Sequence, residues 1–235
     1  VGWVGGLTAF FILTFYMVIS AWLMAYVIQA IGGNLHGADA AVSAQNFSDT
    51  IGAGVHPMQS RWYILALLAV FIAANVIVVG RGVKGGLETA ATILMPAFFV
   101  MLLVVLGFSL MNGDVGRTVD FILKPDFSKV GFGTFLSALG QAFFSIGVGV
   151  GLMLTYGAYL DRGTNIPRAS TIVAGSDTLV AIIAGFTIFP IVFAAGLPEA
   201  SGPSLFFISM PVAFEAIPYG SVFAVVFFAL ALFAA

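Results

Sequence analysis

The 235-residue sequence contains no cysteine and few charged residues, and these two absences exclude several classes of protein. Without cysteine the chain cannot form disulfides, thiolate metal sites or a cysteine nucleophile. Only 8% of the residues are charged, the formal net charge is −2 and the sequence pI is about 5.5. The chain therefore has no basic surface for nucleic acid and too little charge to cover a soluble domain.

The chain is rich in hydrophobic residues. They make up 61% of the sequence, and the mean hydropathy is +1.13. These values predict an all-α integral membrane protein, because a helix satisfies its own backbone hydrogen bonds in hydrocarbon. The chain starts at Val1 without a signal-peptide pattern and stops within an apolar run. We therefore expect an internal fragment of a longer, transporter-sized chain.

Apolar runs long enough to cross about 30 Å of hydrocarbon predict about six helical spans. They cover 7–31, 62–80, 88–111, 133–160, 168–196 and 219–235, the last one cut short. Polar connections separate them at 32–61, 81–87, 112–132, 161–167 and 197–218. Positive charge is densest in the short loops 81–87 and 161–168, which favours a cytoplasmic position for both.

The connection 197–218 is too apolar for a solvated linker and too rich in proline for a span. Its prolines are Pro198, Pro203, Pro211 and Pro218. It can be an extracellular lid over an external vestibule or a re-entrant loop packed on the protein, and the sequence leaves both open.

Of the Asp, Glu, Lys and Arg residues, all but one lie in predicted loops or at the ends of predicted spans. Asp177 is about ten residues into 168–196, between Ser176 and Thr178. A carboxylate near the bilayer centre costs roughly 2.5–3.5 kcal/mol, so it is normally retained for an ion path, a proton relay or a bound cation. The alternative is a structural aspartate, which is either hydrogen-bonded by neighbouring hydroxyls or kept neutral by a raised pKa. Because no Lys, Arg or His lies at the same depth, we expect its partner to be Na⁺, H⁺ or a cationic substrate group.

The centre of the span 133–160 combines glycines with polar side chains. These residues are Gln141, Ser145, Gly147, Gly149 and Gly151. Each glycine costs about 1 kcal/mol relative to alanine in a helix and lets a ligand approach the backbone. We predict a break at about 145–149, with carbonyls suited to Na⁺ on one side and N–H groups suited to a carboxylate on the other. A GxxxG packing face is the alternative, but it needs neither polar side chain.

Tyr16 is a polar aromatic residue deep within the span 7–31, too far from both ends for an interfacial belt. Its hydroxyl needs a partner. That partner is either a neighbouring helix or a substrate group in a cavity.

Five stretches together resemble the neurotransmitter:sodium symporters, particularly their bacterial amino-acid transporters. They are GQAFFSIGVGVGLMLTYGAY, KGGLETAATILMP, AGFTIFP, GPSLFFISMP and the spacing YMVISAW. The resemblance implies a helical bundle with an inverted-repeat transporter fold and a helix broken in mid-membrane. It also implies that 1–235 is a partial single transporter domain containing family spans three to eight. On this basis 1–111 ends the first repeat and 133–235 begins the second.

The resemblance implies roles for individual residues. The substrate site would include Tyr16, Phe144, Ser145, Gly147 and Val150, with Tyr16 at the substrate carboxylate. Gln141 and Phe144 would form the outer gate. Ser145 and Asp177 would bind sodium, and the Ala234 carbonyl would serve a second sodium ion.

Three positions depart from the family pattern. Asp177 stands where chloride-dependent relatives carry asparagine, so we expect its charge to replace chloride and make transport chloride-independent. Gly147 and Val150 occupy positions often held by serine and phenylalanine. Because both changes remove volume, a bulky apolar or aromatic amino acid is the expected cargo.

Together these features predict a secondary active transporter that imports a neutral amino acid with Na⁺ by alternating access. We expect it to be a multi-pass protein of a bacterial inner membrane. The expected partners are the amino acid, the coupling ion Na⁺ and the lipid bilayer, without nucleic acid; the oligomeric state is not predicted.

Two other functions stay open at this point. A proton-coupled transporter is the nearest alternative, because Asp177 could cycle its charge. An ion channel is less favoured, since the polar residues gather around one spot. An enzyme is not expected, because the sequence has no HExxH motif and both histidines lie in 32–61.

Overall fold

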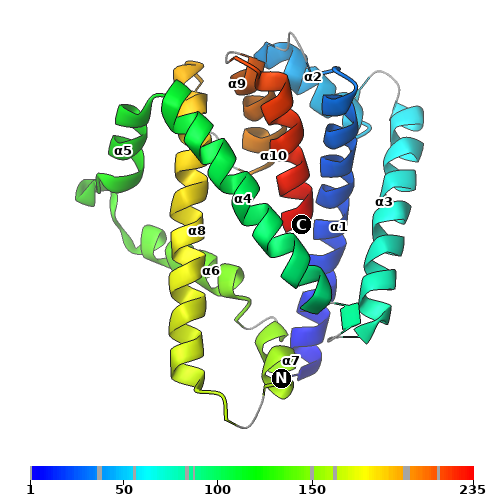
Figure 1. Cartoon of the computed structure of the whole chain (residues 1–235), viewed down its shortest axis with the longest axis vertical. Helices are drawn as coiled ribbons and strands as arrows, with labels where there is room; N and C mark the ends of the chain where they lie inside the picture. Colours follow the sequence, from blue (N-terminus) through cyan, green and yellow to red (C-terminus); the bar gives the residue numbers. More distant parts are fainter. Residues whose placement is uncertain are drawn as a thin grey trace. The chain divides into compact units, whose positions relative to one another are not determined.

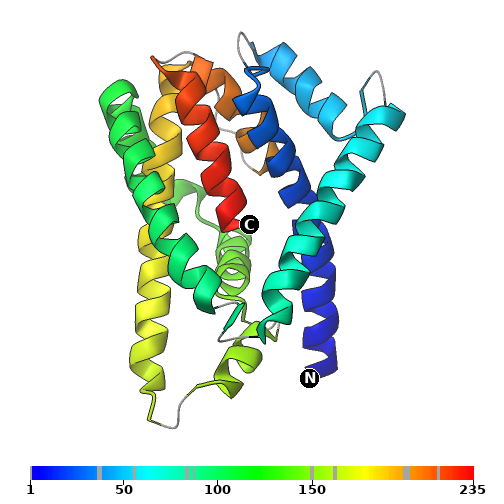
Figure 2. The ribbon, with the colours of Figure 1, turned by 45° about the vertical axis from the view of Figure 1, so that its right-hand side comes forward.

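The computed structural model describes residues 2–35, 39–54, 57–82, 85–86, 88–148, 151–160, 163–197, 202–215 and 218–235. Over these residues the fold is helical and contains no strand, as the sequence predicts (Figures 1 and 2). The chain divides into two compact units. The first unit comprises Val1–Phe15 and Val119–Gly185, and the second comprises Tyr16–Thr118 and Phe186–Ala235.

The long helices match the predicted spans. They are α1 (Gly2–Ile31), α3 (Pro57–Gly80), α4 (Glu88–Asn112) and α8 (Ile166–Ala194). Each contains a stretch long and apolar enough to cross a membrane. The predicted span 133–160 is divided into α6 (Phe132–Ile146) and α7 (Leu152–Ala158), and 219–235 corresponds to the 15-residue α10 (Gly220–Ala234).

The connections contain short helices that the sequence analysis did not predict. They are α2 (Ala40–Thr50), α5 (Val115–Leu123), the 3-10 helix η2 (Phe127–Lys129), the π-helix η3 (Leu205–Ser209) and α9 (Met210–Glu215). α2 begins at Asp39, whose carboxylate accepts the N–H of Val42 at 2.8 Å. Such elements depend on local caps and on packing, so they leave little periodic signal in the sequence.

The hydrophobic core of the second unit is formed by residues of α1, the end of α8, η3, α9 and α10. Its buried side chains include Tyr26, Ile191, Phe207, Phe214 and Phe228. Since η3 and α9 supply part of this core, residues 205–214 of the predicted lid pack on the protein. The function of 197–218 as an extracellular lid stays a prediction.

The corner between α4 and α5 docks on α8 within the second unit. The N–H of Asp114 donates to the Pro190 carbonyl at 2.9 Å. Gly113 lies so close to α8 that an added Cβ would be 2.5 Å from the Cβ of Pro190. The guanidinium of Arg117 lies 4.4 Å from the ring centroid of Phe193. The close packing against Pro190 therefore leaves no room for a side chain at Gly113.

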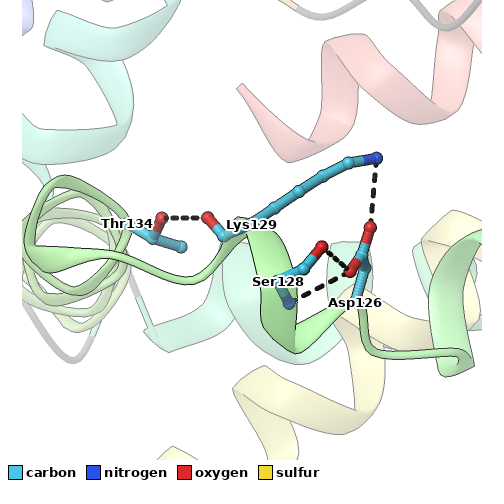
Figure 3. Close-up of polar contacts among 4 residues, drawn as sticks. All are labelled: Asp126, Ser128, Lys129 and Thr134. Atoms are coloured by element: carbon cyan, nitrogen blue, oxygen red, sulfur yellow. Dashed lines mark hydrogen bonds and ion pairs between the residues drawn. The ribbon is translucent and has the colours of Figure 1, made fainter.

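In the first unit, α6 begins after a compact polar turn (Figure 3). The Asp126 carboxylate accepts hydrogen bonds from the hydroxyl and the N–H of Ser128 and pairs with the Lys129 ammonium at 3.2 Å. The Thr134 hydroxyl accepts the N–H of Gly131 and donates to the Lys129 carbonyl. The Ser128 hydroxyl, the Lys129 ammonium and the Ser128 N–H lower the pKa of Asp126 below its ordinary value.

Candidate functional site

The predicted helix break lies at the end of α6. Gly147 follows the last helical turn with φ 72° and ψ 23°, in the left-handed region. Its N–H donates to the Phe144 carbonyl at 3.2 Å, and the N–H of Val148 donates to the Phe143 carbonyl at 3.0 Å. This pair of bonds is a Schellman ending, which glycine favours because it has no Cβ. The prediction of a broken helix is confirmed.

The helix resumes at Leu152, where α7 begins. Gly151 precedes it with φ 83° and is likewise left-handed, so Gly151 cannot belong to an unbroken packing face. A Cβ added to Gly151 would lie 3.4 Å from the carbonyl carbon of Gly5 on α1, within the first unit. At Gly151 the backbone of the broken segment thus lies close to α1. Gly149 and Val150 lie outside the described residues.

α8 brings Asp177 to this break. The Ser145 hydroxyl donates a 2.7 Å hydrogen bond to Oδ1 of Asp177, from a different helix of the first unit. The neighbouring hydroxyl of Thr178 donates to the Ala174 carbonyl at 2.9 Å, within its own helix. The hydroxyl that donates to the Asp177 carboxylate therefore comes from α6 and not from Thr178, the adjacent residue in the chain.

Two sources of negative potential coincide at the break. A helix carries about −0.5 elementary charge at its C-terminal end, where the Ser145 and Ile146 carbonyls follow the Schellman-bonded pair. The second source is Asp177, which forms no ion pair with any described residue. Among the same residues there is no group of three or more His, Cys, Asp and Glu side chains that could hold a metal. One carboxylate with hydroxyl and carbonyl oxygens suits a hard cation such as Na⁺.

Other predicted site residues lie on α6 beside Ser145. Gln141 precedes Ser145 by one helical turn, and Phe144 is its immediate neighbour, with a side chain that is 48% exposed. The first unit therefore brings together Gln141, Phe144, Ser145, Gly147 and Asp177.

Two further predicted residues, Tyr16 and Ala234, belong to the second unit. Tyr16 lies on α1, and its carbonyl accepts the Ser20 hydroxyl at 2.8 Å. Ala234 is the last residue of α10 and is exposed. The roles of Tyr16 at the substrate and of Ala234 at a second sodium ion stay predictions.

The sequence analysis missed the contribution of α1 to the break. The signal available was Gly5 beside Gly6 near the start of the chain, since paired glycines often mark a close backbone approach. The partner, Gly151, lies far away in the sequence and is identified only by the fold.

A polar cavity of about 280 Å³ lies in the second unit, where α2 and α3 meet the end of α1. It is lined by Gln29, Asn34, Asn46, Asp49, Thr50, Ser60 and Tyr63. The amide of Gln29 donates to the Thr50 hydroxyl at 3.1 Å and stiffens one wall. None of the predicted site residues lines this cavity.

Comparisons with known proteins agree with these features. Residues 48–235 match the sequence model described as "Sodium:neurotransmitter symporter family". The chain is 36% identical over 234 residues to the uncharacterized sodium-dependent transporter YhdH of Bacillus subtilis, covering 100% of this chain and 50% of that protein. An uncharacterized sodium-dependent transporter of Haemophilus influenzae is 36% identical over 236 residues, with the same coverage.

A solved structure shows the same architecture. The crystal structure of MhsT in complex with L-phenylalanine is similar with a TM-score of 0.84 and 37% sequence identity. The similarity covers 99% of this chain and 52% of that chain. The present chain therefore spans about half the length of the relatives that it matches.

Proposed function

The chain belongs to the sodium:neurotransmitter symporter family, and on this basis we propose that it serves Na⁺-coupled import of a neutral amino acid by alternating access. Membership of a transporter family agrees with the sequence prediction that the chain is not an enzyme. The coupling ion of the family, sodium, is also the predicted one. The hydrogen bond between Ser145 and Asp177 beside the helix break carries the proposal, because it gathers oxygen ligands where backbone groups are released.

Ser145 and Asp177 are the proposed ligands of one Na⁺. Their oxygens are 2.7 Å apart, so a single cation can contact both once the hydroxyl proton turns away. The carbonyl end of α6 adds negative potential at the same place. Each positive charge that moves inward through 100 mV releases about 2.3 kcal/mol, so one or two sodium ions suffice for useful concentration of the substrate.

The cargo that we propose is a neutral apolar or aromatic amino acid. Gly147 has no side chain at the break, and the exposed ring of Phe144 offers an apolar surface beside it. The similar transporter MhsT was crystallised with L-phenylalanine, which supports the same class of substrate here.

The remaining predicted residues complete the proposal. Tyr16 would bind the substrate carboxylate, and Phe144 and Gln141 would close the site on the outer side. Val150 would make room for the substrate side chain, and the Ala234 carbonyl would bind a second Na⁺. The apolar helices support a multi-pass position, which we place in a bacterial inner membrane because bacterial relatives match the chain.

Uptake by the full-length protein in proteoliposomes tests the proposal. A panel of labelled neutral amino acids including L-phenylalanine is offered with an inward Na⁺ gradient, and choline replaces Na⁺ in the control. We expect saturable uptake that requires Na⁺ and needs a much higher Na⁺ concentration in Asp177→Asn. The matched control Asp126→Asn removes an exposed carboxylate outside the site and should leave uptake intact. Uptake that is unchanged in choline contradicts sodium coupling.

Chloride independence is proposed from the charge of Asp177. As an ionised sodium ligand, Asp177 supplies a negative charge at the cation, so a chloride ion is not needed to balance it. We expect equal uptake in chloride and in gluconate for the native protein. Clear stimulation by chloride would refute this part of the proposal.

A proton-coupled transporter is the second candidate, because Asp177 is a titratable group inside an apolar helix and accepts a hydroxyl hydrogen bond. A protonated Asp177 would carry the coupling charge in place of Na⁺. An inward proton gradient applied in choline discriminates the two. Uptake driven by that gradient, and absent from Asp177→Asn, would establish proton coupling.

A further inference from the structure

The carbonyl of Phe207 lacks its ordinary helical partner. In an α-helix it would accept the N–H of the residue four positions later, and that residue is Pro211, which has no N–H. The chain winds here as the π-helix η3 and continues into α9. A π-helix bonds a carbonyl to the N–H five positions later, and a carbonyl oxygen has two lone pairs, so the Phe207 carbonyl can still accept a donor from another element.

Tyr26 of α1 supplies that donor. Its hydroxyl donates a 2.9 Å hydrogen bond to the Phe207 carbonyl, across 181 positions of the chain and within the second unit. Tyr26 is fully buried and Phe207 is 2% exposed. A buried phenol needs a partner, so the Tyr26 hydroxyl keeps its hydrogen bond only while η3 stays on α1.

Aromatic rings hold the same segment from several sides. Phe207 stacks on Phe47 of α2 with centroids 5.2 Å apart, and it contacts Trp22 and Tyr26 of α1 at 6.0 and 4.9 Å. Tyr26 in turn contacts Phe228 of α10 at 5.1 Å. Ring pairs of this kind stabilise packing beyond their buried area, so separating η3 from α1 would break several stabilising contacts at once.

We propose that Tyr26 is a positioning residue that fixes residues 205–215 to α1 as a permanent wall. The wall then moves with α1 through the whole transport cycle, and this part of the 197–218 connection does not open as a separate lid. The inference rests on the proposed transport function for its cycle, and on the described contacts for its geometry.

Hydrogen exchange of the full-length protein tests the geometry without any ligand. Tyr26→Phe keeps the ring and removes the donor, and we expect amide exchange in 205–215 to accelerate about tenfold, the factor that corresponds to about 1.4 kcal/mol. The double variant Tyr26→Phe, Pro211→Ala restores an N–H to the Phe207 carbonyl and should recover part of the protection. Tyr63→Phe on α3 is the control, because that tyrosine is 40% exposed, and it should leave the segment unchanged.

A second comparison tests the motion. In the wild type, exchange in 205–215 should be the same in K⁺, in Na⁺ and in Na⁺ with L-phenylalanine, whereas a separate lid would change its protection between these states. A state-dependent change of about tenfold in this segment would overturn the proposal. So would a Tyr26→Phe variant whose exchange equals that of the wild type, or one that fails to fold and is not rescued by Pro211→Ala. Absence of uptake would count against the transport function alone, since the ligand-free comparison does not depend on it.

Discussion

Oγ of Ser145 lies 2.7 Å from Oδ1 of Asp177, although 32 positions separate the two residues in the chain. The bond joins the C-terminal end of α6 to the middle of α8. Ser145 lies two positions before the left-handed turn at Gly147. A hydroxyl, a carboxylate and the negative end of a helix therefore meet at one place. The proposed sodium coupling depends on this arrangement.

Removing the charge of Asp177 should weaken sodium coupling more than removing the hydroxyl of Ser145. For Asp177→Asn we expect the Na⁺ concentration for half-maximal uptake to rise at least about tenfold, because the charged ligand is lost. For Ser145→Ala a rise of about fivefold is expected, since one hydrogen-bonding group contributes about 1 kcal/mol. The measurement is the Na⁺ dependence of uptake by the full-length protein. Ser176→Ala is the control, and identical curves for all three variants would remove these residues from the sodium site.

Gly147→Ala should destabilise the protein, because a Cβ in the left-handed region costs about 1–2 kcal/mol. The control is Gly140→Ala, in the interior of α6, where an added Cβ would meet nothing within 4 Å. That change should stabilise the helix by up to about 1 kcal/mol. Thermal unfolding of the full-length protein in detergent measures both. If Gly147→Ala were as stable as Gly140→Ala, the turn at 147 would not be left-handed.

Gly113→Ala should disturb the corner between α4 and α5. The added Cβ would lie 2.5 Å from the Cβ and 2.6 Å from the carbonyl carbon of Pro190, so backbone has to move. Overpacking of this kind costs about 1–3 kcal/mol, visible as a lower unfolding temperature. Gly107→Ala on α4, which has open space around it, should show no such loss. Equal unfolding temperatures for the two variants would contradict the docking of this corner on α8.

The turn before α6 should loosen in acid. Hydrogen bonds from Ser128 and the charge of Lys129 lower the pKa of Asp126, so the folded turn favours the ionised carboxylate. Its stabilisation is complete above the ordinary aspartate pKa of about 3.9 and is lost as the pH falls through the lower, folded value. The amide resonance of Ser128 in NMR spectra of the full-length protein should report this change. In Asp126→Asn that pH dependence should disappear, and a Ser128 shift that persists there would assign it to another group.

Much of the fold follows from local properties of the sequence. The predicted run 88–111 corresponds to α4 (Glu88–Asn112), because an apolar segment of that length can satisfy its backbone in hydrocarbon only as a helix. The break near Gly147 was also predictable, since glycine is the residue that adopts a left-handed turn without a steric penalty. In contrast, α2 and α9 lie in connections for which the sequence analysis predicted no helix.

The sequence by itself determined that the chain is a helical membrane protein, that one helix breaks near Gly147 and that Asp177 is an acid within an apolar span. These are properties of composition, chain length and single residues. Only the tertiary structure decided that the hydroxyl on Asp177 belongs to Ser145, that Gly151 lies against Gly5, and that the Tyr26 hydroxyl donates to the Phe207 carbonyl. The physical reason is that a buried polar group or a close backbone approach requires a partner, but helix packing chooses the partner from distant parts of the chain.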